Sequence, residues 1–204
     1  MNKSAEKRSA KDRILDTAVR LFYQHGYHSV GIDRIIAESG VAKMSLYNHF
    51  PSKDALIVAA IKHMDEQFWI WLERETATAK TAREKLSRIF QAVEKLATST
   101  ECLGCAFQAA AADFPNLENL NHEAAQNHKT KVFNYLFQLA KKAGLHNPKR
   151  LASQLMLLMD GAWSSARMYR TRGPASELAT AAESLIAASA PANGPKKKHR
   201  KKIQ

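Results

Sequence analysis

Few residues in this sequence interrupt helices, and no long apolar run is present. Only six prolines and eight glycines occur among 204 residues, so long helices can form without interruption. Two cysteines cannot build a disulfide scaffold. No apolar stretch reaches the roughly 20 residues of a membrane-spanning helix, and the polar first 13 residues contain no secretory signal. We therefore expect a soluble, cytoplasmic, all-α protein.

Residue groupings that indicate catalysis or metal binding are also missing. The sequence contains eight histidines, but they form no recognisable nucleophile–base set with the cysteines. His122 and His128 lie six positions apart, which is not the i, i+4 spacing that lets two imidazoles share a metal ion. The sequence thus predicts no catalytic residue, no metal site and no cofactor.

Cys102 and Cys105 form a CxxC pair that leaves two interpretations open. A zinc site would need two more ligands, and no second CxxC or HxxxH accompanies the pair. A redox switch is one remaining interpretation, because a thiolate at the start of a helix is reactive. The other is that both are small buried residues beside a helix start.

The chain is basic, with a formal net charge of +12. Half of this charge lies in the segment Lys196–Lys202, whereas residues 1–60 and 61–195 carry +3 each. An excess of positive charge favours a polyanionic partner. Residues 1–9 and 191–204 are predicted to be disordered basic ends, which are either merely solvated or add sequence-independent affinity for DNA phosphates.

Residues 31–50 have the pattern of two short helices joined by a sharp turn. Ile32, Ile35 and Ile36 form one apolar stripe, and Gly40 can adopt the left-handed backbone that ends a helix. This arrangement is a helix-turn-helix, whose second helix enters the DNA major groove. The predicted core of this part consists of Val30, Ile35, Val41, Leu46 and Phe50.

The outward positions of the second helix carry side chains that can contact DNA. His49 could read a base, contact a phosphate or be packed. Lys53 lies in the first turn of the next helix, where its charge opposes the helix dipole. A phosphate could bind the N-terminal N–H groups and this ammonium together; an ordinary exposed lysine is the alternative. The positions best placed to read base edges are Lys43, Met44, Ser45 and Asn48.

The run from Ile14 to Ile57 closely resembles the N-terminal domain of TetR-family transcriptional regulators. The resemblance is dense over roughly the first 60 residues, and beyond them it is mostly an all-helical plan. It implies that the Tyr47 hydroxyl contacts a phosphate, whereas packing of the ring on the first helix is the alternative. The matching features are a helix ending in Phe22 and Gly26–Tyr27, then Ser39–Gly40–Val41, Leu46–Tyr47, His49–Phe50, and Ser52–Lys53 with Leu56.

Two positions depart from the commonest pattern of that family. Gly31 stands where the family often has Thr, so a side-chain cap and a phosphate contact are missing. Ala42 stands where Ser is usual, which removes an N-cap oxygen from the recognition helix. The full predicted DNA-binding set is Gly31, Lys43, Met44, Ser45, Tyr47, Asn48, His49 and Lys53.

Apolar periodicity predicts about nine helices, and no Gly or Pro occurs between residues 52 and 103. Asp160 falls inside an apolar run, so it should be paired, face a pocket or lie near an interface. The expected helices cover residues 10–25, 32–38, 42–49, 52 into the 70s, 81–98, 105–112, 117–143, 148–171 and 175–189.

The resemblance also implies an effector cavity among the fourth to eighth helices and a dimer bundle formed by the last two. We expect a small hydrophobic or aromatic effector and a homodimer through residues 148–171 and 175–189. Aromatic side chains at helical spacing also suit an ordinary core, which is the alternative. The predicted cavity lining is Trp69, Phe90, Phe107, Phe114, Met159 and Trp163.

The predicted organisation is a helix-turn-helix DNA-binding domain at residues 10–60 and a helical effector-binding and dimerisation domain at residues 61–190. The expected function is that of a ligand-released repressor that binds a pseudo-palindromic double-stranded DNA operator as a dimer. Two alternatives stay open. One is a helical scaffold protein without specific DNA reading, and the other is a redox-responsive regulator that uses Cys102 and Cys105.

Overall fold

The computed structural model describes residues 9–191, which form nine α-helices, two short 3-10 segments and no strand. The predicted all-α class is thereby confirmed. The two predicted basic ends, apart from residues 9 and 191, lie outside the described residues. The helices are α1 (Ala10–His25), α2 (Ile32–Ser39), α3 (Lys43–His49), α4 (Lys53–Thr76), α5 (Ala82–Ala97), α6 (Ala106–Asp113), α7 (Leu120–Lys142), α8 (Pro148–Tyr169) and α9 (Leu178–Ala188).

Side-chain caps fix where several helices begin. Ser9, Ser52 and Thr81 accept hydrogen bonds from backbone N–H groups in the first turns of α1, α4 and α5, which satisfies donors that the helix itself leaves unpaired. The start of α7 falls later than predicted, at residue 120, because the side chain of Asn119 caps it. The segment before α9 is a 3-10 turn, Pro174–Glu177, instead of α-helix.

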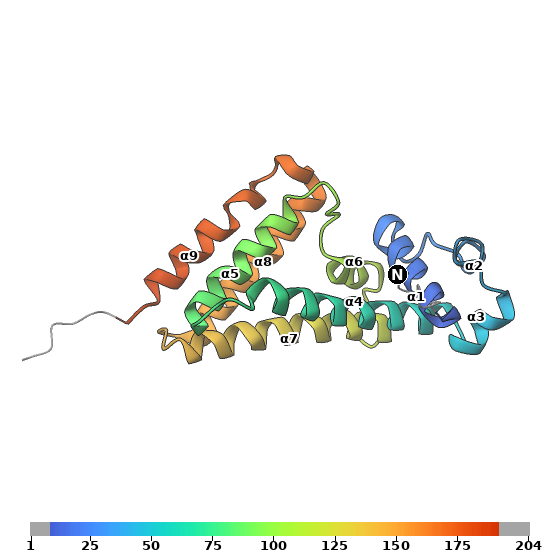
Figure 1. Cartoon of the computed structure of the whole chain (residues 1–204), viewed down its shortest axis with the longest axis horizontal. Helices are drawn as coiled ribbons and strands as arrows, with labels where there is room; N and C mark the ends of the chain where they lie inside the picture. Colours follow the sequence, from blue (N-terminus) through green and yellow to red (C-terminus); the bar gives the residue numbers. More distant parts are fainter. Residues whose placement is uncertain (1–8, 192–204) are drawn as a thin grey trace, which may run out of the picture.

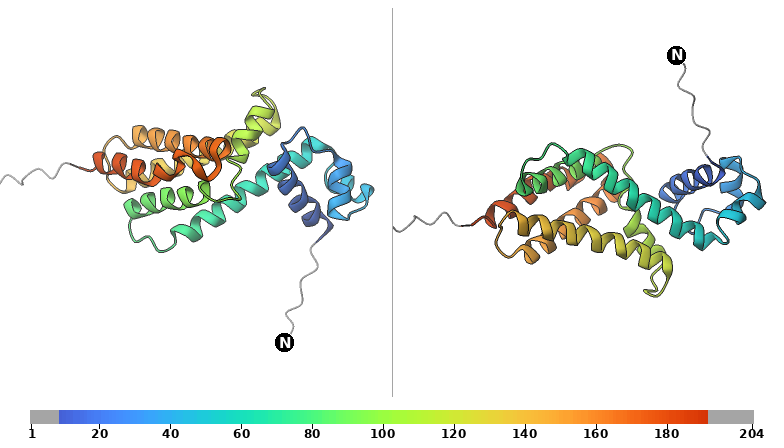
Figure 2. Two further views of the ribbon diagram at one scale, coloured as in Figure 1. Left: turned by 90° about the horizontal axis from the view of Figure 1, so that it is seen from above. Right: turned by 60° about the horizontal axis from the view of Figure 1, so that its bottom comes forward.

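The helices form an elongated molecule with α1, α2 and α3 gathered at one end (Figure 1). The helices α4 and α7 contact each other and run along the length of the molecule. At the other end α5, α8 and α9 pack together, and α6 lies between that group and α1. Two further views show that α4 leads from the N-terminal helices to the rest of the chain without a break (Figure 2).

Helix α4 belongs to both ends of the molecule. Leu56, Ile57 and Ile61 in its first half are fully buried, and α4 contacts α1 there. Leu72 in its second half is also buried, and α4 contacts α5 and α7. A helix without Gly or Pro therefore joins the N-terminal helices to the larger helical group. Among the described helices, none combines the length and the apolar character that crossing a membrane requires.

Candidate DNA-binding face and cavity

The turn between α2 and α3 is formed by Gly40 in the left-handed region, with φ of 61°. Its N–H donates a hydrogen bond to the Ile36 carbonyl at 3.1 Å, which ends α2. The predicted core of this part is confirmed, because every one of its members is buried: Val30, Ile35, Val41, Leu46 and Phe50. These contacts hold α3 against α1 and α2 and fix the face that α3 presents to solvent.

The outward face of α3 carries most of the predicted DNA-binding side chains. Lys43, Met44, Tyr47 and Asn48 are exposed, and their i, i+1, i+4, i+5 spacing puts them on one side of the helix. His49 is exposed at the end of α3, and Ser45 is partly buried. Met44 is 73% exposed and Tyr47 40%. These side chains have little of their surface covered within the chain, so they are available to a partner.

Gly31 and Lys53 lie at the starts of α2 and α4. Gly31 is exposed and makes no side-chain cap. The Lys53 ammonium donates a hydrogen bond to the His28 carbonyl at 3.1 Å, which leaves its charge without a carboxylate at that contact. The Lys43 ammonium lies 3.4 Å from an Asp33 carboxylate oxygen with both side chains well exposed, and such a pair contributes little. Both lysines can therefore turn to a phosphate.

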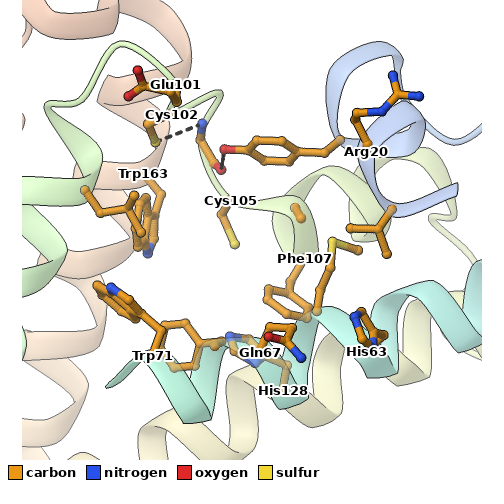
Figure 3. Close-up of a pocket in the computed structure, with 17 residues that line it drawn as sticks. Arg20, His63, Gln67, Trp71, Glu101, Cys102, Cys105, Phe107, His128 and Trp163 are labelled. Atoms are coloured by element: carbon orange, nitrogen blue, oxygen red, sulfur yellow. Dashed lines mark hydrogen bonds between the residues drawn. The ribbon is translucent and has the colours of Figure 1, made fainter. Parts of the chain in front are cut away.

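A second feature is an apolar cavity of about 500 Å³ between α1, α4, α6, α7 and α8 (Figure 3). Its lining includes Phe68 and Trp71 of α4, Phe107 of α6, His128 of α7 and Trp163 of α8. The remaining lining residues are Val19, Arg20, Tyr23, His63, Met64, Gln67, Leu96, Glu101, Cys102, Gly104, Cys105 and Ala106.

His128 of the cavity lining belongs to a polar network with Asp65, Trp69 and Lys131. The Asp65 carboxylate accepts hydrogen bonds from Trp69 Nε1 at 2.9 Å, His128 Nδ1 at 2.8 Å and the Lys131 ammonium. Burial by itself raises the pKa of Asp65, but the hydrogen bonds from Lys131 and His128 outweigh it and hold the pKa below its usual value. Burial lowers the pKa of His128 to about 4 against the opposing pull of Asp65, so the imidazole is neutral at pH 7.

The cavity wall is tied to α1 through tyrosine hydroxyls. The Tyr23 hydroxyl accepts a hydrogen bond from the Leu103 N–H at 2.8 Å and donates one to the Gly104 carbonyl at 3.1 Å. Burial raises the pKa of Tyr23 to about 12, so it keeps its proton. The Tyr27 hydroxyl donates to the Ala106 carbonyl at 3.2 Å. The segment that carries both cysteines is therefore anchored to the helix that packs against α2 and α3.

Comparisons with known proteins agree with this geometry. The sequence profile of the family described as "Bacterial regulatory proteins, tetR family" matches residues 14–60. The HTH-type transcriptional regulator YjdC of Escherichia coli (strain K12) is 20% identical over 177 residues, which cover 86% of this chain and 93% of that protein. A crystal structure of a TetR-family transcriptional regulator from Streptomyces coelicolor matches with a TM-score of 0.83 at 29% identity, over 88% of this chain and 95% of that one.

This chain belongs to the TetR family of transcriptional regulators. The HTH-type transcriptional regulator LmrA of Bacillus subtilis (strain 168) is 45% identical over 58 residues, 28% of this chain and 31% of LmrA. As a member of this family the chain is a DNA-binding regulator and not an enzyme. The described residues also contain no cluster of three or more His, Cys, Asp or Glu side chains that could hold a metal ion.

Two of the six side chains predicted for the cavity of this TetR-family protein, Phe107 and Trp163, do line it. The other four do not, and the prediction is corrected for them. Phe90 and Met159 are buried in the core, because their helices turn those faces toward packed neighbours. Trp69 points to Asp65 and Tyr135, and Phe114 packs on Tyr27 and His28.

Sequence reasoning missed the contribution of α1 to the cavity of this regulator. The side of α1 that faces α4 and the segment around Cys102 carries Val19, Arg20 and Tyr23. Periodicity shows that this side of α1 is partly covered, but it does not show which element covers it. Asp160 forms an ion pair with the Lys129 ammonium, which is one of the environments expected for it. Both cysteines are buried and reduced, and Cys105 accepts a hydrogen bond from the Gln108 N–H at the start of α6.

Proposed function

We propose that this TetR-family protein is a ligand-released repressor that binds a pseudo-palindromic operator as a homodimer. The observation that carries the proposal is the junction between the two sites described above. The apolar cavity is lined in part by α1, which contacts α2 and α3, and by α4, which packs on α1. A molecule in the cavity would therefore touch the scaffold of the DNA-binding face.

On the DNA side, we propose that residues 10–60 are the DNA-binding unit and that α3 lies in the major groove. Lys43, Met44, Ser45 and Asn48 would read base edges, since they project from the exposed side of a short helix. The exposed end of α3 would add His49, which can donate to a base or a phosphate. Phosphate contacts, which set register without reading sequence, would come from the Gly31 backbone, Tyr47 and Lys53.

A second copy of this chain is the proposed partner of α8 and α9. Helix α8 has an exposed stripe of small and apolar residues at i, i+4, i+8, i+11 and i+15, namely Ser153, Leu157, Gly161, Ser164 and Met168. Leu157 is 73% exposed and Met168 70%. A Cβ added at Gly161 would meet no atom within 4 Å, so a partner helix can approach closely. The adjacent helix α9 would complete a four-helix seam in the effector and dimerisation unit, residues 61–190.

Ligand control would act through the two connections between the cavity and α1. One is α4, which contributes Met64, Phe68 and Trp71 to the wall and packs on α1. The other is the Tyr23 hydroxyl, which binds the backbone beside Cys102 and Cys105. A ligand releases DNA only if it binds the DNA-incompetent arrangement better than the competent one. Displacement of either connection gives the ligand such a preference.

The experiment that tests this function is selection of binding sites from random duplex DNA, followed by affinity measurements against salt on the winning sequence. An inverted repeat bound far more tightly than scrambled DNA would support a dimeric, sequence-specific regulator. Binding without sequence preference that vanishes when residues 196–204 are deleted would contradict it and favour a scaffold protein.

A redox-responsive mode is tested with the same operator. Thiol oxidation by hydrogen peroxide should leave operator affinity unchanged if Cys102 and Cys105 act only in packing, which their burial and their acceptor roles in hydrogen bonds favour. A loss of affinity that is restored by dithiothreitol and absent in Cys105→Ala would instead establish redox control.

A further inference from the structure

The cavity of the proposed effector site has apolar walls and a polar mouth. The side chains that surround its interior are Phe68, Trp71, Phe107 and Trp163 together with both thiols. Arg20, Gln67 and Glu101 also line it but are exposed, so they belong to the opening and stay hydrated. An effector that enters the cavity loses its hydration shell and is then surrounded by aromatic side chains, which favours an aromatic molecule without a net charge.

His128 is the exception inside this apolar surround. Its side chain is only 4% exposed, and its neighbours cover it on three sides. One ring face stacks on Phe107 with centroids 3.5 Å apart and planes at 7°. Phe68 meets the ring edge-on at 4.9 Å, and Nδ1 lies 2.8 Å from an Asp65 carboxylate oxygen. The other nitrogen, Nε2, has no hydrogen-bond partner among the described residues.

The partner of Nδ1 decides what Nε2 can do. A carboxylate only accepts hydrogen bonds, so Nδ1 must carry the proton that it shares with Asp65. Asp65 remains ionised because Lys131 and Trp69 also donate to it. Burial keeps the imidazole neutral by lowering the pKa of His128, so Nε2 bears a lone pair and no proton. Nε2 is not one of the fully enclosed side-chain atoms that lack a partner, and His128 lines the cavity, so a ligand with a suitable donor can pair with this acceptor.

We propose that the effector is a neutral aromatic molecule with a phenolic hydroxyl, which donates its O–H to His128 Nε2 while its ring packs among Trp71, Phe107 and Trp163. This inference rests on the proposed function only for the role of the cavity as an effector site. A carboxylate at the same place would bring a second acceptor against Nε2 and would have to lose its hydration. A methyl ether of the same shape would leave Nε2 without a donor.

The test is calorimetric titration of the full chain, without DNA, at pH 7.5 with three probes that share one ring system. The probes are 2-naphthol, 2-methoxynaphthalene and 2-naphthoate. We expect 2-naphthol to bind at least about tenfold more tightly than its methyl ether, because only the naphthol can donate a hydrogen bond to Nε2. The naphthoate anion should bind most weakly. Equal affinity for the naphthol and its ether would overturn the proposal, as would a preference for the anion.

A matched pair of variants locates the acceptor. His128→Phe keeps a ring between Phe107 and Phe68 but removes Nε2, so the preference for naphthol over its ether should disappear. His63→Phe removes another imidazole of the same wall, one that is partly exposed, and should keep the preference. A preference that survives in His128→Phe and disappears in His63→Phe would overturn the assignment to His128.

A spectroscopic measurement on the unaltered protein covers the case in which His128→Phe does not fold. With ¹⁵N-labelled histidine, addition of 2-naphthol should shift one unprotonated Nε2 resonance in the direction of hydrogen-bond acceptance, and 2-methoxynaphthalene should not. If no histidine resonance responds to naphthol binding, the proposal is wrong.

Release of the selected operator, followed by fluorescence anisotropy, separates this inference from the proposed function. Selective naphthol binding that leaves the operator bound would support the His128 contact and contradict the effector role of the cavity. Sequence-specific operator binding by a protein that binds all three probes equally would uphold the DNA-binding part of the proposed function and overturn the His128 contact.

Discussion

At the scale of single residues, Gly104 has almost no room for a side chain in the segment that connects the cavity to α1. Its φ is 90°, in the region that side chains rarely adopt, and a Cβ there would lie 2.9 Å from both the Trp163 carbonyl oxygen and the Arg167 Cβ. The close approach places the Gly104 carbonyl where Tyr23 can donate to it. One residue thus combines a positive φ that suits glycine, a tight contact and an anchoring hydrogen bond.

We expect Gly104→Ala to lower the free energy of unfolding by roughly 2 kcal/mol or more, since backbone strain and a clash with backbone add. Urea unfolding measures this loss. The matched control is Gly144→Ala, because Gly144 also has positive φ, at 67°, but its Cβ would meet nothing within 4 Å. That variant should lose only about 1 kcal/mol from strain alone. Equal losses would show that the contact with α8 is unimportant.

The proposed DNA contacts also differ residue by residue. Lys53→Ala and Tyr47→Phe should weaken binding to all DNA sequences alike, and Lys53→Ala should reduce the slope of log affinity against log salt by about one. Asn48→Ala should cost about 1–3 kcal/mol on the selected operator and less on mutated sites. Anisotropy titrations at several salt concentrations measure both. Lys80→Ala, beyond the far end of α4, is the charge control and should change nothing.

At the scale of elements, the proposed DNA-reading helix α3 starts without a side-chain cap. Ala42 occupies the N-cap in extended conformation, with φ of −63° and ψ of 145°, and no side chain caps the helix. The helix has only seven residues, so its stability depends on packing of Leu46 and Phe50 more than on its own hydrogen bonds. The missing cap leaves N–H groups of its first turn for solvent or for DNA phosphates.

We expect Ala42→Ser to stabilise the protein by about 1 kcal/mol, because the backbone already has the conformation in which a serine oxygen accepts from the N2 or N3 N–H. Thermal unfolding would detect the gain as a higher Tm. Ser52→Ala, which removes the cap of α4 at 3.0 Å from the Ala55 N–H, should produce a loss of similar size. A gain from both substitutions, or from neither, would contradict the capping argument.

The elements themselves were largely predictable, and the side chains that meet between them were not. Gly26, Gly40 and Gly144 end helices where the sequence placed helix ends, because positive φ is a local property. Phe90 is buried in the core although a place in the cavity lining was predicted for it, because periodicity does not tell a core neighbour from a cavity. His128 depends on Asp65, 63 positions away, and only the packing of α4 on α7 brings them together.

At the scale of the whole molecule, the buried pair of Asp65 and His128 makes stability depend on pH. The folded state holds the pKa of His128 at about 4, whereas an unfolded histidine titrates near 6.5. Between these two pKa values His128 binds a proton in the unfolded chain but not in the folded chain, so the free energy of unfolding falls as pH falls. The pKa of Asp65 is also lowered, and its contribution is lost at still lower pH.

We therefore expect a loss of at most about 3 kcal/mol between pH 6.5 and pH 4 from His128. Urea unfolding at a series of pH values measures it. His128→Phe should flatten the curve in this interval, and His63→Phe should retain its slope. A curve for His128→Phe that is as steep as that of the unaltered protein would assign the acid sensitivity to other groups.

The proposed dimer seam is also a property of the whole molecule. Leu157→Asp puts a charge in the middle of the exposed stripe of α8, where a partner helix would bury it, so it should convert the protein to monomers. Analytical ultracentrifugation measures the change, and operator affinity should fall with it. The control is Gln138→Asp on the exposed side of α7, which should remain dimeric. If the Leu157→Asp variant remains dimeric, the dimer interface does not lie on this stripe of α8.

The uninterrupted course of α4 has a consequence for how small a movement suffices. Its 24 residues span about 36 Å, so a tilt of about 5° around its middle moves each end by about 1.5 Å. In the proposed dimer, two protomers that tilt in opposite senses would change the separation of their α3 helices by about 3 Å, close to the roughly 3.4 Å that separates successive base pairs. Because α4 moves as a stiff unit, a small displacement near its middle is enlarged at its ends. A ligand that shifts Phe68 and Trp71 by less than one bond length would therefore make the spacing of the two α3 helices differ from the spacing of the two DNA half-sites.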